Sequence, residues 1–555
     1  MRKILLLFAA AAVCGYANAS TEWTISGTQF RVDTLYHANI GPGTTQTEIK
    51  MTCLAEGNNY VNRIFYTTVD LTNDNVEMRV VKGQDHMGKF ETVSSMAKRK
   101  TAEGNGDYFA GVNGDFFGSY PISTCISNGS LTNFRIESDI NHPCSFIMSD
   151  KKVPVIADSI EGVARNAKGN VTFPDNTQYP FEFNDQRWTD ELIVYTYQYM
   201  FNENKGAHRS GQNEWGAETQ IRPVENATMF GQDGVYEVMC APTPSGTGGN
   251  MEIPADGFVL SGHGNAAELV TALKVGDKIK INMPFSADGK PIVAKEVIGG
   301  FPVILRNGEV LSRPAYPEHL SSRQPRTAVG YNSDKTKVIM AVVDGRNAGV
   351  SEGLYTHILA GVMLNLGCVD AMNFDGGGSS TSYVQNLGVR NTPCNTGNAE
   401  RTVTNGLFAV STAPADDVIT SIEIADKAVN LNAGDKYTPV VYGYNKYGVL
   451  VNANLAGFHI NTAPEIGTVD GGTITIGSGK YNTTMTVWYE GLSYTIPVYT
   501  NGGGTYVSEV IEINTNEVDY TPEYYTLQGI KVTNPQKGQV VIVRKAGIVY
   551  KEIVK

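Results

Sequence analysis

The sequence predicts an α+β protein built mainly from β-sheets. Strand-like apolar runs recur from residue 20 onward, whereas apolar residues at helical spacing occur at 265–277 and 353–367. After residue 418 only alternating strand patterns follow. We therefore expect mixed β-sheets with few helices in a first large domain, followed by a β-sandwich domain and a small β domain at the C-terminus.

The composition and the N-terminus indicate a globular, exported protein. The 555 residues carry a net charge of −12 without a block of like charge, so neither nucleic acid nor an anionic membrane is an expected partner. Residues 1–19 have the basic start, apolar core and small-residue end of a signal peptide. Cys14 raises the alternative of lipidation, but Val13 is too large for that processing. We expect secretion or a place in the cell envelope, with no membrane span.

Changes in composition divide the rest of the chain. Residues 20–413 combine many strand-like runs with a short helix at 265–277, for which Asn265 is the predicted N-cap. After the linker APADD, residues 418–500 alternate in strand fashion with turns about every ten positions, which is typical of a small β-sandwich. After the linker NGGGT, residues 507–555 form a third, hairpin-like β domain.

Six cysteines follow the signal peptide, and an even number in an exported chain permits disulfides. Cys125–Cys144 is the first candidate pair, because a short loop-like segment separates the two residues. Cys368–Cys394 is the second candidate. Isolated buried thiols are the alternative.

Two strings, VVDGR and NFDGGGSST, predict the site. Each is an apolar run that ends in an aspartate followed by glycine, and the helix at 353–367 lies between them. Asp344 and Asp375 are 31 positions apart, which fits a strand–helix–strand unit with its two strands parallel. Both aspartates should then lie at the carboxyl ends of strands in one sheet, where α/β sheets bind ligands.

A hairpin adds cationic groups to this edge. Strands 325–332 and 338–344 are joined by SDKTK, and their expected register places Asp344 opposite Pro325 or Arg326. Arg326, Asp344 and Arg346 should therefore converge, with Asp375 one strand away. Such a group is either an ion-pair network that holds loops or a site where arginines bind an anion and a carboxylate does acid–base or nucleophilic work.

The glycine run favours the second reading. Three successive glycines after a strand allow several N–H groups to face one way as a nest that binds phosphate or another oxyanion. The predicted nest comprises Gly376, Gly377, Gly378, Ser379 and Ser380. A plain tight turn is the alternative, but it needs fewer glycines.

Two further segments carry polar candidates. Asn113 and Asp115 follow a strand in VNGDFFG, where an Asn-Gly turn is the simpler interpretation. His263 lies between glycines in LSGHG, where an exposed loop histidine is the simpler interpretation. No G-x-S-x-G elbow, H-E-x-x-H motif or Walker loop occurs.

Taken in order, these strings resemble the phosphodiester glycosidase family, whose namesake is N-acetylglucosamine-1-phosphodiester α-N-acetylglucosaminidase. The resemblance covers roughly residues 50–411, and its specific part is RTA, DGR and DGGGSS, with NGDFF, NDQRW, LSGHG and ERTVTN in support. One departure is His357-Ile358, where family members often carry an acidic residue. Residues 418–500 resemble bacterial Ig-like modules, and the last fifty residues are similar to C-terminal sorting-type domains of exported Bacteroidetes proteins.

The resemblance implies hydrolysis of a sugar-1-phosphodiester, with N-acetylglucosamine as the expected sugar, to free sugar and a phosphomonoester. It places Arg326, Arg346 and the 376–380 nest on the phosphate, Asp375 or Asp344 as base or nucleophile, and Asn113 and Asp115 on sugar or water. His263 is a further substrate-binding candidate. No cofactor is expected; the spacing of Asp115, Asp344 and Asp375 does not indicate a divalent cation, although these carboxylates could hold one. The C-terminal domain implies export machinery as a partner.

Two rival functions remain open at the level of sequence. One is a glycan-binding cell-surface protein with a non-catalytic site. The other is an ordinary glycosidase that acts on phosphate-free sugars. Turnover of phosphate-linked and phosphate-free substrates separates them.

Overall fold

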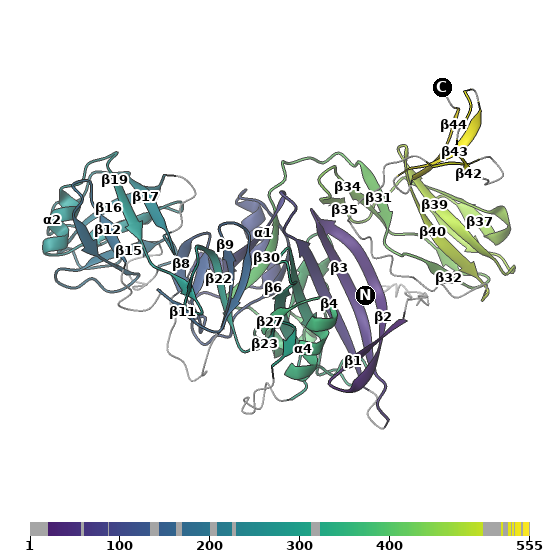
Figure 1. Cartoon of the computed structure of the whole chain (residues 1–555), viewed down its shortest axis with the longest axis horizontal. Coiled ribbons are helices and arrows are strands. Elements are labelled where there is room, and N and C mark those ends of the chain that lie inside the picture. The colour runs from purple at the N-terminus through teal and green to yellow at the C-terminus, as the bar shows by residue number, and fades with distance from the viewer. Residues whose placement is uncertain are drawn as a thin grey trace, which may run out of the picture. The chain divides into compact units, whose positions relative to one another are not determined.

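The computed structural model describes residues 20–56, 60–86, 88–133, 144–162, 169–199, 208–224, 229–311, 322–502 and parts of 523–553. The predicted signal peptide lies outside these residues. The chain divides into two compact units, 1–505 and 506–555. Within the described residues β-strands dominate and the α-helices are α1 (Val93–Ala102), α2 (Asn265–Thr271) and α4 (Thr356–Asn365), which confirms the predicted sheets with few helices (Figure 1). No helix in the described part of the chain is long and apolar enough to span a membrane.

A nine-stranded antiparallel sheet, called the main sheet, carries both predicted aspartates at strand ends. In spatial order its strands are β1 (Ser20–Ile25), β2 (Thr28–Gly41), β3 (Thr44–Cys53), β4 (Val61–Asp70), β26 (Lys337–Val343), β25 (Arg326–Tyr331), β27 (Asp370–Asn373), β23 (Val303–Arg306) and β24 (Glu309–Val310). β25 pairs with β26. Val343 lies opposite Arg326 and Val338 lies opposite Tyr331, which confirms the predicted hairpin register.

The chain crosses from β26 through α4 to β27, as predicted. β25 lies between those two strands and is antiparallel to both, so they run parallel without being neighbours. The central strands β25, β26 and β27 are buried on both faces of the main sheet. Successive side chains of a strand point to opposite faces, so each of these strands packs against two layers. On β26, Ile339, Ala341 and Val343 pack toward α4. The residues between them, Val338, Met340 and Val342, pack toward a second sheet. This burial on two sides explains the uninterrupted apolar run of β26.

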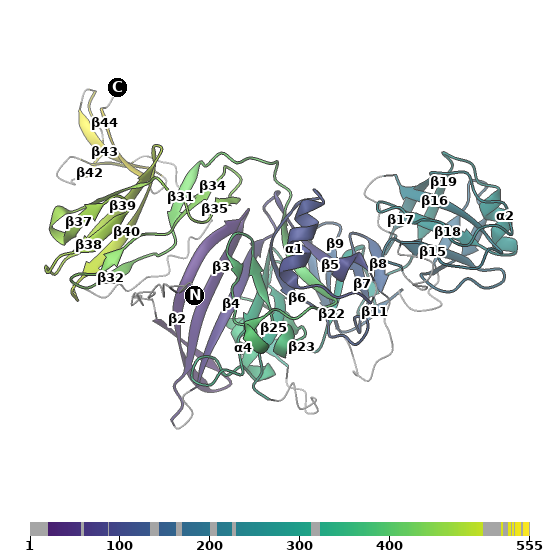
Figure 2. The same cartoon turned by 180° about the vertical axis from the view of Figure 1, so that it is seen from behind.

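The second sheet, called the upper sheet, has five strands: β29 (Gly388–Val389), β28 (Ser382–Val384), β6 (Asp107–Asn113), β30 (Asn405–Ser411) and β5 (Val76–Lys82). α1 packs beside β6 on this sheet through Val93, Met96 and Ala97 (Figure 2). A further five-stranded sheet contains β10 (Pro154–Ala157), β9 (Cys144–Ser149), β22 (Ala294–Gly300), β7 (Cys125–Ser127) and β8 (Ser130–Asn133). A three-stranded sheet contains β11 (Ile160–Glu161), β20 (Ser286–Ala287) and β21 (Lys290–Pro291).

Residues 170–282 contain an eight-stranded sheet, called the inserted sheet, whose core is continuous with residues of β7, β8, β9 and β22. Its strands are β13 (Gln178–Pro180), β12 (Asn170–Thr172), β19 (Lys278–Asn282), β17 (Asp233–Val238), β16 (Ala217–Pro223), β18 (Phe258–Gly262), β15 (Leu192–Thr196) and β14 (Glu182–Phe183). α2 is shorter than predicted. Its N-cap is Gly264, not Asn265, and the Asn265 N–H donates to the Asp190 carboxylate at 2.8 Å.

Residues 421–500 form three small sheets around a shared core. The first contains β31 (Ser421–Ile424), β34 (Val441–Tyr444) and β35 (Leu450–Asn452); the second β32 (Val429–Leu431), β40 (Leu492–Thr500), β39 (Asn482–Tyr489) and β36 (His459–Thr462); the third β33 (Lys436–Tyr437), β38 (Thr473–Ile476) and β37 (Gly467–Asp470). The C-terminal unit contains a four-stranded sheet of β42 (Lys531–Val532), β41 (Glu523–Tyr525), β43 (Val540–Lys545) and β44 (Ile548–Ile553).

All six cysteines after residue 19 are free, so the predicted disulfides are wrong. β22 lies between β7 and β9, the strands that carry Cys125 and Cys144. Two strands separated by a third lie roughly 9–10 Å apart, farther than a disulfide can bridge. Cys368 is buried, and Cys394 lies beside the Arg346 guanidinium at 3.7 Å.

Candidate active site

Asp375 lies where the main sheet meets the upper sheet. It follows β27, and its N–H donates to the carbonyl of Gly114 at 2.9 Å. Asn113, the last residue of β6, donates from Nδ2 to the carbonyl of Asp375 at 2.8 Å. The ends of β27 and β6, far apart in the sequence, therefore build one site. The Asp375 side chain is half-buried, and this burial raises its pKa to about 6.

Asn113 holds this junction together from within. Its side chain is fully buried, and Oδ1 accepts hydrogen bonds from the Thr327 hydroxyl at 2.7 Å and the Thr381 N–H at 3.1 Å. A side chain buried in this way positions the Asp375 loop. The expected contact of Asn113 with sugar or water is therefore replaced by contacts inside the protein.

Asp115 is a second buried carboxyl behind Asp375. It accepts hydrogen bonds from the N–H of Ser123 at 2.7 Å and from the Ser123 hydroxyl at 3.2 Å. Burial, with a smaller effect of the Asp375 charge, raises the Asp115 pKa to about 7. Only 2% of Asp115 is exposed, so Asp375 is the more accessible of the two carboxyls.

The described N–H donors of the glycine run point into the protein and do not form the predicted open nest. The N–H groups of Gly376, Gly377, Ser379 and Ser380 donate to Asp375 Oδ1 and to the carbonyls of Pro325, Gly376 and Gly377. These four donors face the protein, so they do not form an open oxyanion cradle. The Ser380 hydroxyl is buried and has no hydrogen-bond partner among the described residues.

Close approach and backbone conformation favour glycine at these three positions. A Cβ on Gly376 would lie 2.7 Å from the Pro325 carbonyl. Gly377 has φ +61°, and a Cβ there would lie 3.0 Å from an Arg346 guanidinium nitrogen. A Cβ on Gly378 would lie 2.3 Å from a guanidinium nitrogen of Arg401. Two exposed arginines therefore rest on the glycine loop directly after Asp375.

Arg401 was missed by the sequence analysis as a site residue, although its string ERTVTN was noted. Its charge lowers the Asp375 pKa against the larger opposing effect of burial. The segment that carries it is held by α1, since Glu400 accepts a hydrogen bond from the Ser94 N–H at 3.1 Å. Arg401 follows an irregular segment and is 26 positions from Asp375, so no periodic pattern in the sequence indicates that the two residues are close.

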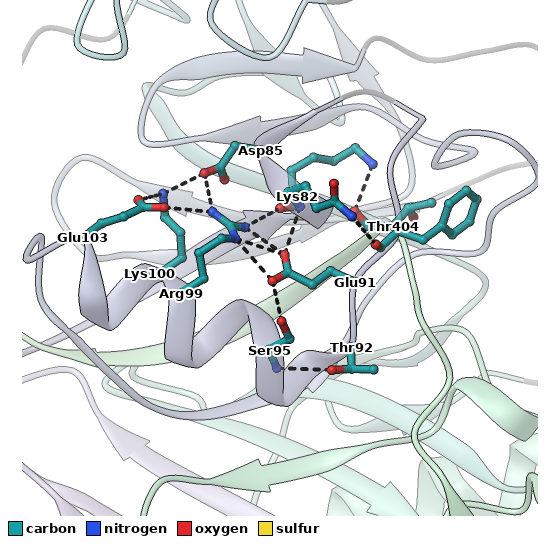
Figure 3. Close-up of polar contacts among 11 residues, drawn as sticks. Lys82, Asp85, Glu91, Thr92, Ser95, Arg99, Lys100, Glu103 and Thr404 are labelled. Atoms are coloured by element: carbon teal, nitrogen blue, oxygen red, sulfur yellow. Dashed lines mark hydrogen bonds and ion pairs between the residues drawn. The ribbon is translucent and has the colours of Figure 1, made fainter. Parts of the chain in front are cut away.

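Figure 3 shows how the end of this segment is held at Thr404. Lys82 Nζ donates to the carbonyl of Thr404 at 2.9 Å. Arg99 on α1 contacts Asp85, Glu91 and Glu103, and Glu91 pairs through its backbone with Val403. Asn405 Oδ1 then accepts the N–H of Asp115 at 2.9 Å. The ion-pair network of α1 thus supports the segment that links Arg401 to Asp115.

Arg326 and Asp344 lie on the adjoining side of the site. Arg326 is buried and donates to the carbonyls of Leu354 at 2.9 Å and Ser322 at 2.7 Å. Burial, assisted by the charge of Arg346, lowers its pKa to about 10. These contacts hold loop positions, so Arg346 and Arg401 are the more accessible cations.

Asp344 lines a small pocket of about 140 Å³ with Arg346, Thr392 and Cys394. Its carboxylate accepts the Thr392 N–H and, at 3.1 Å, Asn391 Nδ2. Asn391 Nδ2 also donates to the Ser380 carbonyl at 3.0 Å, so this pocket adjoins the glycine loop. Burial raises the Asp344 pKa to about 6.

His263 is not brought to this group by any described contact. It follows β18 of the inserted sheet, donates from its N–H to the Glu191 carbonyl at 3.0 Å, and has its ring 6.4 Å from that of Trp215. Among the described residues, no three His, Cys, Asp or Glu side chains gather in a way that could hold a metal ion, and this includes the three aspartates.

Residues 235–410 match the family model described as phosphodiester glycosidase. The matched segment contains Arg326, Asp344, Arg346, the 375–380 loop and Arg401. This match supports the family that the sequence strings resemble and suggests a glycosidase activity on phosphodiesters.

Individual relatives are distant. The SPbeta prophage-derived uncharacterized protein YomE of Bacillus subtilis (strain 168) is 39% identical over 72 residues, 13% of this chain and 11% of that protein. The chain therefore spans only a small part of that relative.

Three solved structures are similar. A hypothetical protein from Synechocystis has a TM-score of 0.41 and 15% identity over 66% of this chain and 62% of that chain. A putative exported protein from Burkholderia pseudomallei K96243 has a TM-score of 0.43 and 15% identity over 71% and 99%. The zebrafish N-acetylglucosamine-1-phosphodiester α-N-acetylglucosaminidase catalytic domain, auto-inhibited by its pro-peptide, has a TM-score of 0.34 and 12% identity over 68% and 87%.

Proposed function

We propose that this protein is an exported glycosidase that hydrolyses a sugar-1-phosphodiester, with N-acetylglucosamine as the sugar. The observation that carries the proposal is the placement of two guanidinium groups, those of Arg346 and Arg401, on the glycine loop directly after a half-buried aspartate. Guanidinium groups bind phosphate through paired, charge-assisted hydrogen bonds.

The chemistry of the reaction fits this arrangement. The bond between the anomeric carbon and the phosphate oxygen breaks, and a water oxygen takes its place on the sugar. A phosphomonoester leaves readily, so the site needs to bind its charge rather than to protonate it strongly. Asp375 acts as base or nucleophile beside the anomeric carbon, where positive charge develops. Asp115 supports it from behind as a carboxyl of raised pKa.

The 20–413 segment is the proposed catalytic part, with 1–19 as signal peptide, 418–500 as an Ig-like module and 507–555 as a sorting-type domain. The described strands of the last two segments are compatible with β modules. A reporter fused after residue 19, compared with the same reporter without residues 1–19, tests export directly.

The activity is tested with two matched substrates, a methyl phosphodiester of N-acetylglucosamine and a phosphate-free p-nitrophenyl N-acetylglucosaminide. The expected result is turnover of the first alone. Turnover of the second alone would indicate an ordinary glycosidase. Turnover of neither would indicate the rival function, a glycan-binding protein.

A further inference from the structure

The inserted sheet exposes two tryptophans close to His263, and the proposed active site uses none of the three. Trp215 and Trp188 are 68% and 59% exposed, more than the other two tryptophans in the described residues. Exposure of so much aromatic surface on neighbouring loops is costly in water and commonly marks a binding surface. We infer that Trp188, Trp215 and His263 form a binding surface for a neutral glycan.

The two loops that carry the tryptophans are fastened together by a buried guanidinium. Arg187, whose side chain is 0% exposed, donates from its NH2 group to the carbonyl of Asn213 at 2.7 Å and to Asn213 Oδ1 at 3.2 Å. Trp188 follows Arg187 directly and Trp215 follows Asn213 by two positions. A Cβ on Gly216 would lie 2.3 Å from the centre of the Arg187 guanidinium, so the backbone beside Trp215 rests on it.

The charge of Arg187 is compensated inside the protein. Glu218, also 0% exposed, lies 3.5 Å away, and the Ser261 hydroxyl bridges the two side chains. This buried pair ties both loops to β16 and β18. Breaking such a pair is expensive, so the two tryptophan loops are held in fixed positions. Loops that are already held in place lose little conformational entropy when they bind a ligand.

The loop of His263 is a neighbour of both tryptophan loops. The His263 ring lies 6.4 Å from that of Trp215. The backbone N–H of His263 donates to the Glu191 carbonyl, and the Glu191 carboxylate accepts the backbone N–H of Trp188 at 2.7 Å. The three residues therefore lie on loops at the same end of β15, β18 and β16, because Leu192 and Ala217 both pair with Gly262; Figure 2 labels the three strands.

The surrounding charges indicate what this surface binds. Apart from His263, the charged residues of segments 188–191, 213–215 and 263–268 are Asp190, Glu191, Glu214 and Glu268, which are all acidic. An acidic border disfavours a phosphate or another anion. It suits a neutral pyranose, whose C–H face packs on an indole and whose hydroxyls donate to carboxylates. The inference rests on the proposed function only in its choice of a glycan.

The test measures binding of chitohexaose, cellohexaose and mannohexaose to the full chain by calorimetry and tryptophan fluorescence. The variants are Trp188→Ala and Trp215→Ala, with Trp488→Ala, 46% exposed outside the inserted sheet, as the matched control. We expect at least one hexasaccharide to bind, and each of the first two variants to weaken that binding about tenfold or more, which is about 1.4 kcal/mol. Trp488→Ala and Asp375→Asn should bind like the wild type.

Hydrolysis of the small methyl phosphodiester is measured in parallel, and Trp188→Ala and Trp215→Ala should leave it unchanged. If the wild type binds none of the three hexasaccharides, or if both tryptophan variants bind as the wild type does, the inference is wrong. Absence of hydrolysis in the wild type would instead overturn the proposed function, and the binding result would stand by itself.

Discussion

Asn113 Nδ2 donates a 2.8 Å hydrogen bond to the backbone carbonyl of Asp375. This single contact joins the last residue of a strand in the upper sheet to the loop that leaves the main sheet. The position of the Asp375 carboxylate therefore depends on the packing of two sheets, and a change in the buried amide should affect both stability and activity.

Replacing Asn113 with Ala should lower both the stability and the activity of the protein. The change leaves the Asp375 carbonyl and the Thr327 hydroxyl without their buried partner, so we expect a loss of about 1–3 kcal/mol in the free energy of unfolding. Urea denaturation measures this loss. Thr327→Val removes one of the bonds and should give a smaller effect in the same direction. An Asn113→Ala protein with wild-type stability and rate would contradict the positioning role.

Replacing Asp375 with Asn should abolish turnover and leave stability nearly unchanged. The amide keeps the shape of the carboxylate but cannot act as base or nucleophile, for which we expect a loss of 10²–10⁴-fold or more in kcat. Steady-state kinetics and a thermal melt check the two parts. Asp375→Ala should give the same separation, whereas a large fall in melting temperature would mean that the residue is mainly structural.

The buried Asp115 should make stability depend on pH. Its pKa is raised to about 7 from the ordinary 3.8. Below about pH 4 the carboxyl is protonated in both states, and between pH 4 and 7 only the unfolded state releases the proton, so the folded state is progressively penalised. Asp115→Asn lacks this penalty, and its amide can still pair with Ser123.

The measurable quantity is the free energy of unfolding of Asp115→Asn minus that of the wild type, at pH 4, 6 and 8. We expect this difference to shift in favour of the variant by about 1 kcal/mol or more as the pH rises, because one pKa unit corresponds to about 1.4 kcal/mol. A difference that is constant with pH would show that the carboxyl titrates normally.

The two exposed arginines should act on the phosphate and not on the sugar. Arg346→Ala and Arg401→Ala should each lower kcat/KM for the phosphodiester about 10–100-fold, since a hydrogen bond to a charged group contributes about 1.5–3 kcal/mol. Arg222→Ala is a suitable control, because Arg222 pairs with Asp256 on the surface of the inserted sheet. If Arg222→Ala lowers kcat/KM by the same factor, the effect comes from the net charge of the protein and not from a contact with the phosphate.

The glycine loop offers a steric test of the same contact. Gly378→Ala would place a Cβ 2.3 Å from an Arg401 guanidinium nitrogen and 2.4 Å from Asn395 Oδ1, so it should displace both side chains and lower activity at least as much as Arg401→Ala does. Gly118→Ala, where nothing lies within 4 Å of the added carbon, should be neutral. The double variant Gly378→Ala/Arg401→Ala should be no worse than Gly378→Ala alone, because Gly378→Ala already displaces Arg401. Losses of activity that add in the double variant would show that the two changes act independently.

The sequence predicted those features that depend on local pattern. A short turn between two apolar runs determined the β25–β26 register, and helical spacing placed α4. The convergence of Arg346 with the Asp375 loop followed from that register. The remaining features depend on residues far apart in the chain. Arg401 reaches Gly378 because α1 and β5 hold segment 400–405, and β22 separates Cys125 from Cys144.

The glycine run shows a further limit of sequence reasoning. Glycine permits a positive φ, an open nest or the close approach of another group, and the letters alone do not distinguish among these. Here Gly377 combines a positive φ with an arginine contact, and Gly378 admits an arginine. His263 lies in a loop after β18, and its neighbours there could not be inferred without the pairing of that sheet.

The fate of the water oxygen tests the central claim most directly. The wild type is incubated with a methyl phosphodiester of N-acetylglucosamine in ¹⁸O-labelled water, and the products are analysed by ³¹P NMR and mass spectrometry at early times. The proposed glycosidase places the label on the anomeric carbon of the sugar and leaves the phosphomonoester unlabelled. Label in the phosphomonoester, or no turnover at all, would contradict the account.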